Sequence, residues 1–513
     1  MFKNVGANWA LNALQILVLL KLAPFVVDTL GRAQNGVWVT IVSLTGVLSL
    51  LVVGVPMASV RFVAEHVAKK DLARANAAVS TCLGICIGLG VAALVAGSFL
   101  FAFFELVYLH GPQGADLSPE AIQGARIALA VVVIQVAMGF AMRLPYGIFD
   151  AHQDFVVRNA IMAGELFLRL ALTLVLRAWK ASLPALAIVQ VACMFFEFAL
   201  AIVVLHRRHP GIRFGLASFD RSLVRGILGF SVFAMLLNVG NLLAFRSDAL
   251  VIGARLDAAQ VTFFDMGNKF FDPMTGLLIA VGAVVMPMTA KLHATGEREE
   301  LRRMFLKWSK ISLSIVLLIG TYLLVLGPEF LGAWAGPDFV GPSGGVLQVL
   351  MASFLFYLPV RGVALPVLLG LGKPKVPGLA LLAMGLVNLA LSLVLVRPLG
   401  ILGVALGTAV PNVLFAGTLL ALACRELEIP VSRYFGYVAV RASLGAILPL
   451  SLLLFLKHGL HVTGFVPLVA AGLASVLVFA VAWVGFVYRN DPHLDLRAEI
   501  GRAWPALARR RAP

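Results

Sequence analysis

Charged side chains interrupt several long apolar stretches of the sequence. A charged group at the centre of a bilayer costs at least about 2.5–3.5 kcal/mol on insertion scales, so it persists where it faces water, a ligand or an opposite charge. We therefore treat these residues as candidates for a polar site inside a membrane. The basic members are Lys21, Arg169, Arg246, Lys269 and Arg361, and the acidic members are Glu165, Glu197, Asp248, Asp265 and Asp272.

The spacing of three of these charges predicts that they share a site. Asp265, Lys269 and Asp272 are separated by four and then three residues, so a continuous helix would carry all of them on one face. Lys21 and Arg246 are 225 residues apart, close to the local offset of an internal repeat described below. We expect these two cations at equivalent places in the two halves of the chain.

Arg and Lys in such a setting are suited to phosphate, which they bind by charge-assisted hydrogen bonds. The same residues allow a second interpretation, in which the nearby aspartates neutralise the cations and no ligand binds. Glu165 and Arg169, four residues apart, are best explained as an intrahelical pair. Arg361 is either a cavity cation or a residue whose head group reaches an interface. Glu197 has no obvious partner.

The composition indicates that these charges lie in a membrane protein. Hydrophobic residues make up 61% of the 513 and charged residues 13%, against about 45–50% and 25% in soluble domains. This excludes a soluble enzyme, a nucleic-acid-binding domain and a disordered chain. We predict an all-α polytopic membrane protein with about fourteen spans, at residues 5–29, 37–60, 76–104, 125–147, 157–176, 182–205, 224–254, 259–289, 309–327, 346–370, 376–396, 401–424, 437–456 and 464–488.

The distribution of basic residues predicts the orientation. With the N-terminus inside, the inside segments hold 29 Lys and Arg residues and the outside segments 7, so both termini are predicted to be cytoplasmic. The longest outside loop, near 105–124, ends at a helix start with Ser118 as cap and Pro119 as first residue. It is too short for the active site of a sugar polymerase or ligase, and we predict no enzyme. Inside segments 61–76 and 291–310 are predicted to form short surface helices.

Cofactor and metal chemistry have no sequence support. Cys82, Cys86, Cys193 and Cys424 lie in apolar runs without nearby histidines, which favours plain packing over a metal site. No G-x-x-x-x-G-K-[ST] motif is present. We predict no cofactor, and an energy source in an ion gradient, the membrane potential or downstream use of the product.

An internal repeat predicts two parallel lobes. Leu170–Leu176 matches Leu389–Leu395 at six of seven positions with an offset of 219, and Ala33-Gln34 matches Ala259-Gln260 with an offset of 226. Six spans per half give both halves the same orientation, as in transporters with a substrate site between two lobes. The predicted division is a lobe at 1–206, a cytoplasmic linker at 207–223, a second lobe at 224–425, and two further helices with a basic tail at 426–513.

This plan of six, six and two spans resembles the polysaccharide-transporter branch of the multidrug/oligosaccharidyl-lipid/polysaccharide exporter superfamily, the Wzx-type O-antigen and exopolysaccharide flippases. The residues that carry the resemblance are Leu30-Gly31, Gly36-Val37-Trp38, Gly54-Val55-Pro56-Met57-Ala58 and the segment from Arg246 to Gly253. The resemblance implies a bacterial cytoplasmic (inner) membrane protein that works by alternating access. It further implies a central cationic cavity lined by spans 1, 2, 7 and 8.

We therefore predict a flippase for a polyprenyl-pyrophosphate-linked oligosaccharide. The alternative is an ion-coupled multidrug or organic-cation antiporter of the same superfamily. The predicted partners are the lipid-linked oligosaccharide, membrane lipids, H⁺ or Na⁺ as candidate coupling ions, and glycan polymerase or export proteins, with no nucleic acid. The predicted substrate-binding residues are Lys21, Arg61, Arg246, Lys269 and Arg361, and the predicted ion-coupling or charge-balancing residues are Asp248, Asp265 and Asp272.

Overall fold

The computed structural model describes residues 2–52, 54–115, 117–178, 181–494 and 496, and these residues form helices and connecting loops without a strand. The chain divides by its internal packing into two compact units, Met1–Asp265 and Met266–Pro513. Within the described residues, twelve helices are long and apolar enough to cross a membrane. The predicted all-α polytopic membrane fold is confirmed.

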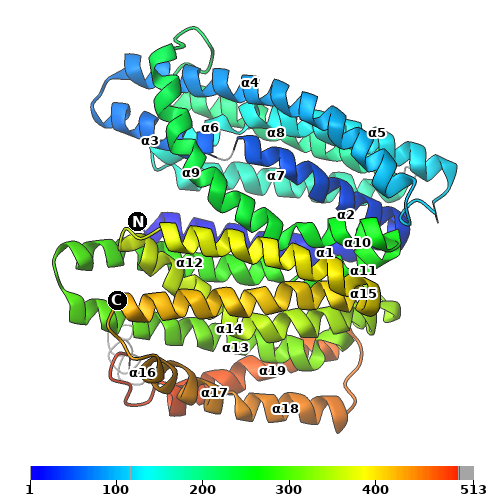
Figure 1. Cartoon of the computed structure of the whole chain (residues 1–513), viewed down its shortest axis with the longest axis vertical. Helices are drawn as coiled ribbons and strands as arrows, with labels where there is room; N and C mark the ends of the chain where they lie inside the picture. The colour runs from blue at the N-terminus through cyan, green and yellow to red at the C-terminus, as the bar shows by residue number, and fades with distance from the viewer. Residues whose placement is uncertain (1, 53, 116, 179–180, 495, 497–513) are drawn as a thin grey trace, which may run out of the picture. The chain divides into compact units, whose positions relative to one another are not determined.

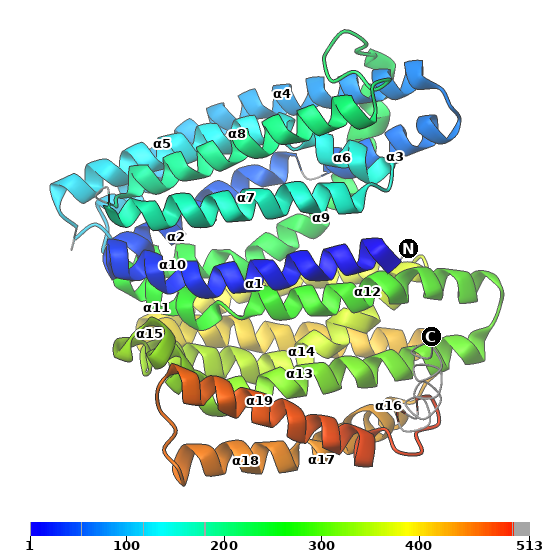
Figure 2. The same ribbon diagram turned by 180° about the vertical axis from the view of Figure 1, so that it is seen from behind.

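Unit 1 is a bundle in which α4, α5 and α8 lie side by side (Figure 1, Figure 2). Ser118 caps α5 as predicted, because its Oγ accepts a hydrogen bond of 3.2 Å from the Ala121 amide and Pro119 begins the helix. The helices of this unit are α1 (Phe2–Leu30), α2 (Arg32–Gly46), α3 (Gly54–Ala68), α4 (Leu72–Phe104), α5 (Pro119–Met142), α6 (Leu144–Ala151), α7 (Phe155–Val175), α8 (Leu183–Arg208), α9 (Arg221–Phe245) and α10 (Ser247–Arg255), with α11 (Ala258–Asn268) crossing the boundary between the units.

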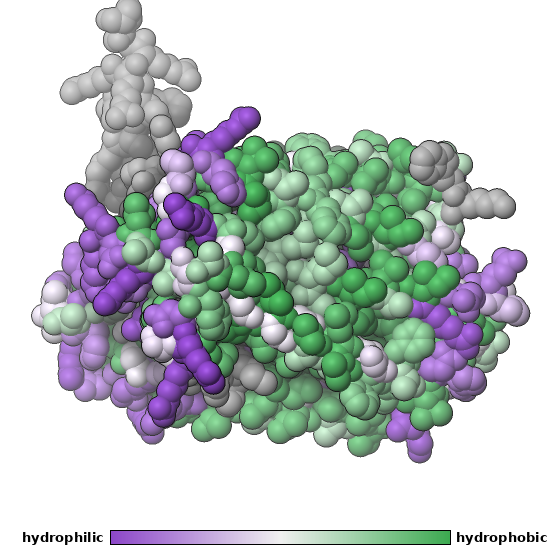
Figure 3. All heavy atoms as spheres, turned by 90° about the horizontal axis from the view of Figure 1, so that it is seen from above, coloured by the Kyte–Doolittle hydropathy of each residue, from purple (hydrophilic) through white to green (hydrophobic). Residues whose placement is uncertain are grey.

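The outer face of unit 1 is built for lipid. Phe99 on α4 is 73% exposed and Ile188 on α8 is 59% exposed, although both are large apolar side chains. Figure 3 shows such residues as a broad hydrophobic band over this face, with hydrophilic residues gathered at its two ends. A surface of this kind would aggregate in water, so the unit is placed across a bilayer with its polar ends at the two interfaces.

The start of α11 belongs to unit 1 because it packs closely on α2. A β-carbon at Gly36 would lie 1.7 Å from the Ala258 carbonyl oxygen, so only glycine allows this contact. The Asn35 amide donates a 3.1 Å hydrogen bond to Thr262 Oγ1, and Thr262 donates one of 2.7 Å to the Arg32 carbonyl. The packing boundary thus falls after Asp265 and not in the predicted linker at 207–223; the predicted lobes remain a prediction.

Unit 2 contains the remaining helices, and α14 packs between α12, α13 and α15 (Figure 1). Its longest helix, α15, consists of two helices that meet at Gly400, where a φ of 57° and ψ of −138° interrupt the helical path. The predicted tail beyond residue 496 lies outside the described residues. The helices are α12 (Phe271–Ala294), α13 (Arg298–Ala335), α14 (Pro342–Gly370), α15 (Lys375–Glu426), α16 (Val431–Phe435), α17 (Arg441–Gly445), α18 (Ile447–His458) and α19 (Phe465–Ala482).

Each of the fourteen predicted spans overlaps a helical segment, but the predicted surface helices at 61–76 and 291–310 are wrong. Residues 61–68 continue α3, and residues 298–310 are the first turns of the 38-residue α13. The charged residues there suggested an interfacial helix. In the structure the same helix continues from the charged segment into the apolar one.

Lys310 of α13 anchors the C-terminal helices to unit 2. Lys310 and Asp491 form an ion pair in which both side chains are 1% exposed, and Lys310 also donates to the Val487 carbonyl at 2.9 Å. Tyr437 donates to the second Asp491 oxygen at 2.6 Å. Burial opposes ionisation of Asp491, but the hydrogen bonds from Lys310 and Tyr437 outweigh it and hold its pKa below the ordinary value. The pair therefore stabilises the fold at neutral pH and is lost in acid, as the pH falls through that lowered pKa.

The predicted orientation can be checked with two cysteine substitutions at exposed positions. Ala115→Cys should react with an impermeant thiol reagent on intact cells, and Thr295→Cys only after permeabilisation, because the two residues lie in segments predicted outside and inside. The four native cysteines are buried, so the unsubstituted chain serves as an unlabelled control. Labelling with the opposite sidedness would invert the topology.

Candidate functional site

The structure distributes the predicted site residues over both units. Arg61 is exposed on α3 and Lys21 is exposed on α1, whereas Asp248 on α10 is buried with 3% exposure. Each unit thus presents cations of its own. Unit 1 holds Lys21, Arg61, Arg246, Asp248 and Asp265, and unit 2 holds Lys269, Asp272 and Arg361.

Two of the predicted cations occupy interruptions between helices. Arg246 separates α9 from α10, with a φ of −120° that takes it out of the helical range. Lys269 follows the end of α11 at Asn268 and precedes the start of α12 at Phe271. Interrupted spans in transporters place polar backbone and charged groups together near the substrate.

The interruption at Lys269 corrects one sequence prediction. Asp265, Lys269 and Asp272 do not share the face of one continuous helix, because Asp265 is on α11, Asp272 is in the first turn of α12, and Lys269 lies between them. The Lys269 amide donates a long hydrogen bond of 3.4 Å to the Met266 carbonyl, as in a single turn that is not continued. The spacing rule for one helix therefore does not apply to this cluster.

The charges in spans 5 and 6 pair within unit 1. Arg169 and Glu165 form the predicted intrahelical ion pair at 2.6 Å, and Glu165 is 6% exposed. Glu197, for which the sequence indicated no partner, accepts a 2.6 Å hydrogen bond from the Tyr146 hydroxyl of α6. These acids therefore have structural partners of their own.

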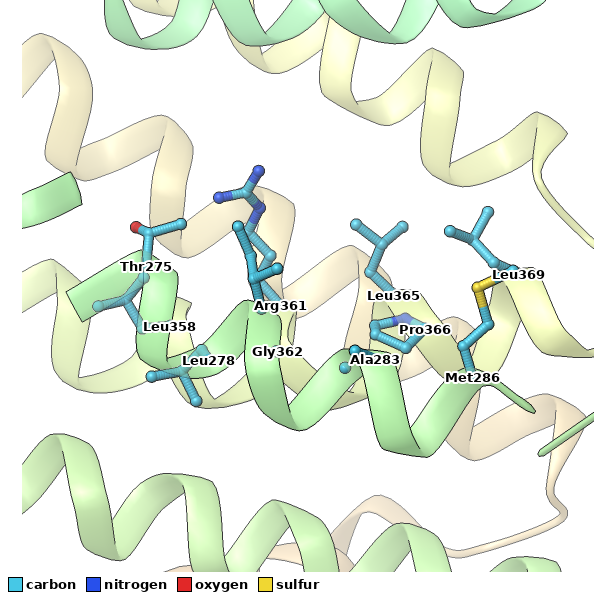
Figure 4. Close-up of a pocket in the computed structure, with 12 residues that line it drawn as sticks. Thr275, Leu278, Ala283, Met286, Leu358, Arg361, Gly362, Leu365, Pro366 and Leu369 are labelled. Carbon is cyan, nitrogen blue, oxygen red and sulfur yellow. The ribbon is translucent and has the colours of Figure 1, made fainter. Parts of the chain in front are cut away.

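A groove of about 240 Å³ lies between α12 and α14 of unit 2 (Figure 4). Two glycines let the helices approach there. A β-carbon at Gly282 would lie 2.8 Å from Pro366 Cγ, and one at Gly362 would lie 3.0 Å from Leu278 Cβ. The groove is lined by Thr275, Leu278, Ile279, Gly282, Ala283, Met286, Leu358, Arg361, Gly362, Leu365, Pro366 and Leu369.

The groove combines one cation with apolar walls. Arg361 is its only charged lining residue among the described residues, and no acidic residue lines it. The Arg361 guanidinium lies 5.7 Å from the ring centroid of the fully buried Tyr357, which orients it by a cation–π contact. Of the two interpretations of Arg361, the structure shows a half-buried cation in a groove wall.

Thr275 is a groove residue that sequence reasoning missed. Its Oγ1 is buried and has no hydrogen-bond partner among the described residues. A buried hydroxyl without a partner costs free energy, which a ligand that hydrogen-bonds to it would recover. A single threonine in an apolar span carries no sequence signal; its position three residues after Asp272 was the one available hint.

Comparisons with known proteins agree with this architecture. Residues 118–339 match a family described as a polysaccharide biosynthesis protein. The membrane protein EpsK of Bacillus subtilis is 23% identical over 505 residues, covering 93% of this chain and 94% of that protein.

Two solved structures share the fold. The lipid II flippase MurJ in an inward closed conformation superposes with a TM-score of 0.69 at 13% identity, over 94% of this chain and 99% of that one. An inward-facing multidrug resistance MATE family transporter of the MOP superfamily gives a TM-score of 0.65 at 16% identity, over 80% and 98%.

These structural neighbours are a flippase and a transporter, and the matched family concerns polysaccharide synthesis. The expectation drawn from the sequence motifs is confirmed. The chain is therefore similar to a polysaccharide biosynthesis family over residues 118–339 and to EpsK over most of its length, and it shares the fold of the flippase and the transporter.

Proposed function

We propose that the protein is a flippase that moves a polyprenyl-diphosphate-linked oligosaccharide across the bacterial cytoplasmic membrane by alternating access. The observation that carries this proposal is the α12–α14 groove, in which Arg361 is set among apolar walls. A lipid-linked sugar offers a diphosphate for the guanidinium and an apolar chain for the walls. The family description and the flippase neighbour support this substrate class.

The remaining predicted cations are proposed to interact with the anionic head group during transport. They are Lys21, Arg61 and Arg246 in unit 1 and Lys269 in unit 2. In this proposal Asp248, Asp265 and Asp272 balance the positive charges. When the anionic substrate binds the cations, the aspartates bind H⁺ or Na⁺ instead. Glycan polymerase and export proteins are proposed as partners that receive the flipped substrate.

The alternative is an antiporter for organic cations. The three aspartates favour it, since a cationic drug requires negative charge in the cavity, and a neighbour of known fold is a multidrug transporter. The α12–α14 groove argues against it, because a cation would meet Arg361 there and no acid among the described lining residues.

A direct binding experiment tests the proposal. The full-length protein in nanodiscs should bind radiolabelled undecaprenyl diphosphate, and Arg361→Ala should weaken that binding about tenfold or more, because a hydrogen bond to a charged group contributes about 1.5–3 kcal/mol. Arg361→Lys should retain part of the affinity, since the charge stays but the planar fork is lost.

The matched control is Arg397→Ala, which removes an exposed arginine of α15 and should leave binding unchanged. Tetraphenylphosphonium serves as the organic-cation probe. Saturable binding of tetraphenylphosphonium together with no binding of undecaprenyl diphosphate would favour the antiporter and reject the flippase.

A further inference from the structure

We propose that the apolar part of the α12–α14 groove binds the isoprene units next to the diphosphate, so that the protein holds the beginning of the prenyl chain itself. This inference rests on the proposed function and adds a subsite to it. It makes the carrier lipid, and not the glycan alone, a determinant of recognition.

The groove changes from polar to apolar along its length. In Figure 4 the Thr275 hydroxyl and the Arg361 guanidinium lie toward one end, and Leu365, Met286 and Leu369 lie toward the other. Leu358 and Leu278 also line the end that holds Thr275 and Arg361, but beyond Gly282 on α12 and Gly362 on α14 all lining residues are apolar. A ligand with a charged head and an apolar chain fits this order in one direction.

The size and chemistry of the groove exclude the glycan as its occupant. A volume of about 240 Å³ is below the ~300 Å³ of the smallest sites for drug-sized ligands, so the groove holds only part of a large amphiphile. Sugar hydroxyls require many hydrogen-bonding partners, and the side chains that line the groove offer only Thr275 and Arg361. A short apolar chain leaves no polar group unpaired beside the leucines.

Close helix packing gives the groove a fixed floor. Gly282 of α12 and Gly362 of α14 bring the two backbones together beneath it, and Pro366 fills the space between them. Met286 at the apolar end has a flexible side chain that adapts to the shape of a ligand. The site is therefore largely formed before a ligand binds, which lowers the ordering cost of binding.

The direction of the groove has a consequence for transport. Both α12 and α14 end in segments that are predicted to be cytoplasmic, so the apolar end lies on the cytoplasmic side of Arg361. A prenyl diphosphate bound along it has its head toward the outside and its chain toward the inside. This is the orientation of a lipid in the outer half of the bilayer, after translocation.

The test compares diphosphates that differ only in chain length. Dimethylallyl, geranyl and farnesyl diphosphate are titrated onto the full-length protein in phosphatidylcholine nanodiscs. The affinity should rise at least tenfold from the dimethylallyl to the farnesyl compound. Ala283→Phe, which fills the exposed groove wall, should reduce this gain to less than threefold.

The matched control is Ala352→Phe, an exposed position of α14 that lines a different groove and should keep the full length dependence. Equal affinity for the three compounds, or an unchanged length dependence in Ala283→Phe, would overturn the inference. So would complete displacement of farnesyl diphosphate when the nanodiscs contain phosphatidylglycerol, since the groove would then be a phospholipid site.

Failure of this inference differs from failure of the proposed function. If Arg361→Ala weakens the binding of dimethylallyl diphosphate, but the three diphosphates bind the native protein with equal affinity, the diphosphate site stands and the prenyl subsite does not exist. If that binding is indifferent to Arg361→Ala, the proposed function itself is wrong at this site.

Discussion

Arg246→Ala and Lys269→Ala are each expected to reduce glycan export about tenfold or more in cells that contain normal amounts of the protein. Both cations lie where a span is interrupted, Arg246 between α9 and α10 and Lys269 between α11 and α12. Such positions bring charge and free backbone groups to a substrate. Loss of one charge-assisted hydrogen bond to a diphosphate costs about 1.5–3 kcal/mol, which lowers the affinity for the substrate about tenfold or more. We expect export to fall with the affinity.

The measurement is surface polysaccharide in a deletion strain complemented with each variant, normalised to the amount of membrane-inserted protein. Arg246→Lys and Lys269→Arg should restore part of the export, because phosphate accepts either cation. Arg255→Ala removes an exposed arginine in the last turn of α10 and serves as the control. Normal export in both alanine variants would reject a cationic substrate site at these interruptions.

Lys310→Met is expected to destabilise the protein by about 3–5 kcal/mol, because it leaves the Asp491 carboxylate buried without its partner. The measurement is the thermal unfolding midpoint of the purified protein in detergent, which should fall by a large amount. The double variant Lys310→Met, Asp491→Asn should recover most of the loss. It removes both charges and keeps an acceptor for Tyr437 and for the His493 amide.

Lys307→Met, one turn earlier on α13 and only partly buried, is the control and should leave the midpoint nearly unchanged. A Lys310→Met variant as stable as the native chain would show that the pair does not anchor the C-terminal helices. A double variant as unstable as the single one would assign the loss to packing around Tyr437 and Tyr488, whose rings lie 4.8 and 5.2 Å from the Lys310 ammonium.

The sequence alone indicates that the chain lies in a membrane, and it predicts the fold class and the approximate positions of the spans. An apolar stretch of about 20 residues has few stable fates other than a membrane helix, and this local property can be read without knowing its neighbours. The same holds for the Ser118 cap and for the Glu165–Arg169 pair, because each involves residues within one helical turn. The loose motifs around Gly36 also indicated the family, and the structure shows a contact there that only glycine permits.

Tertiary structure alone decided where helices are interrupted and which polar groups meet. No local pattern distinguishes Lys269, between two helices, from a residue within one. Lys310 was grouped with the cytoplasmic charges, yet Asp491, 181 residues away, allows it to be buried. Helix packing also brings Tyr146 to Glu197. It places Thr275 and Arg361 in one groove. For Lys310 and Glu197, the free energy of a polar group inside the helix packing depends on a partner distant in sequence, which that packing supplies.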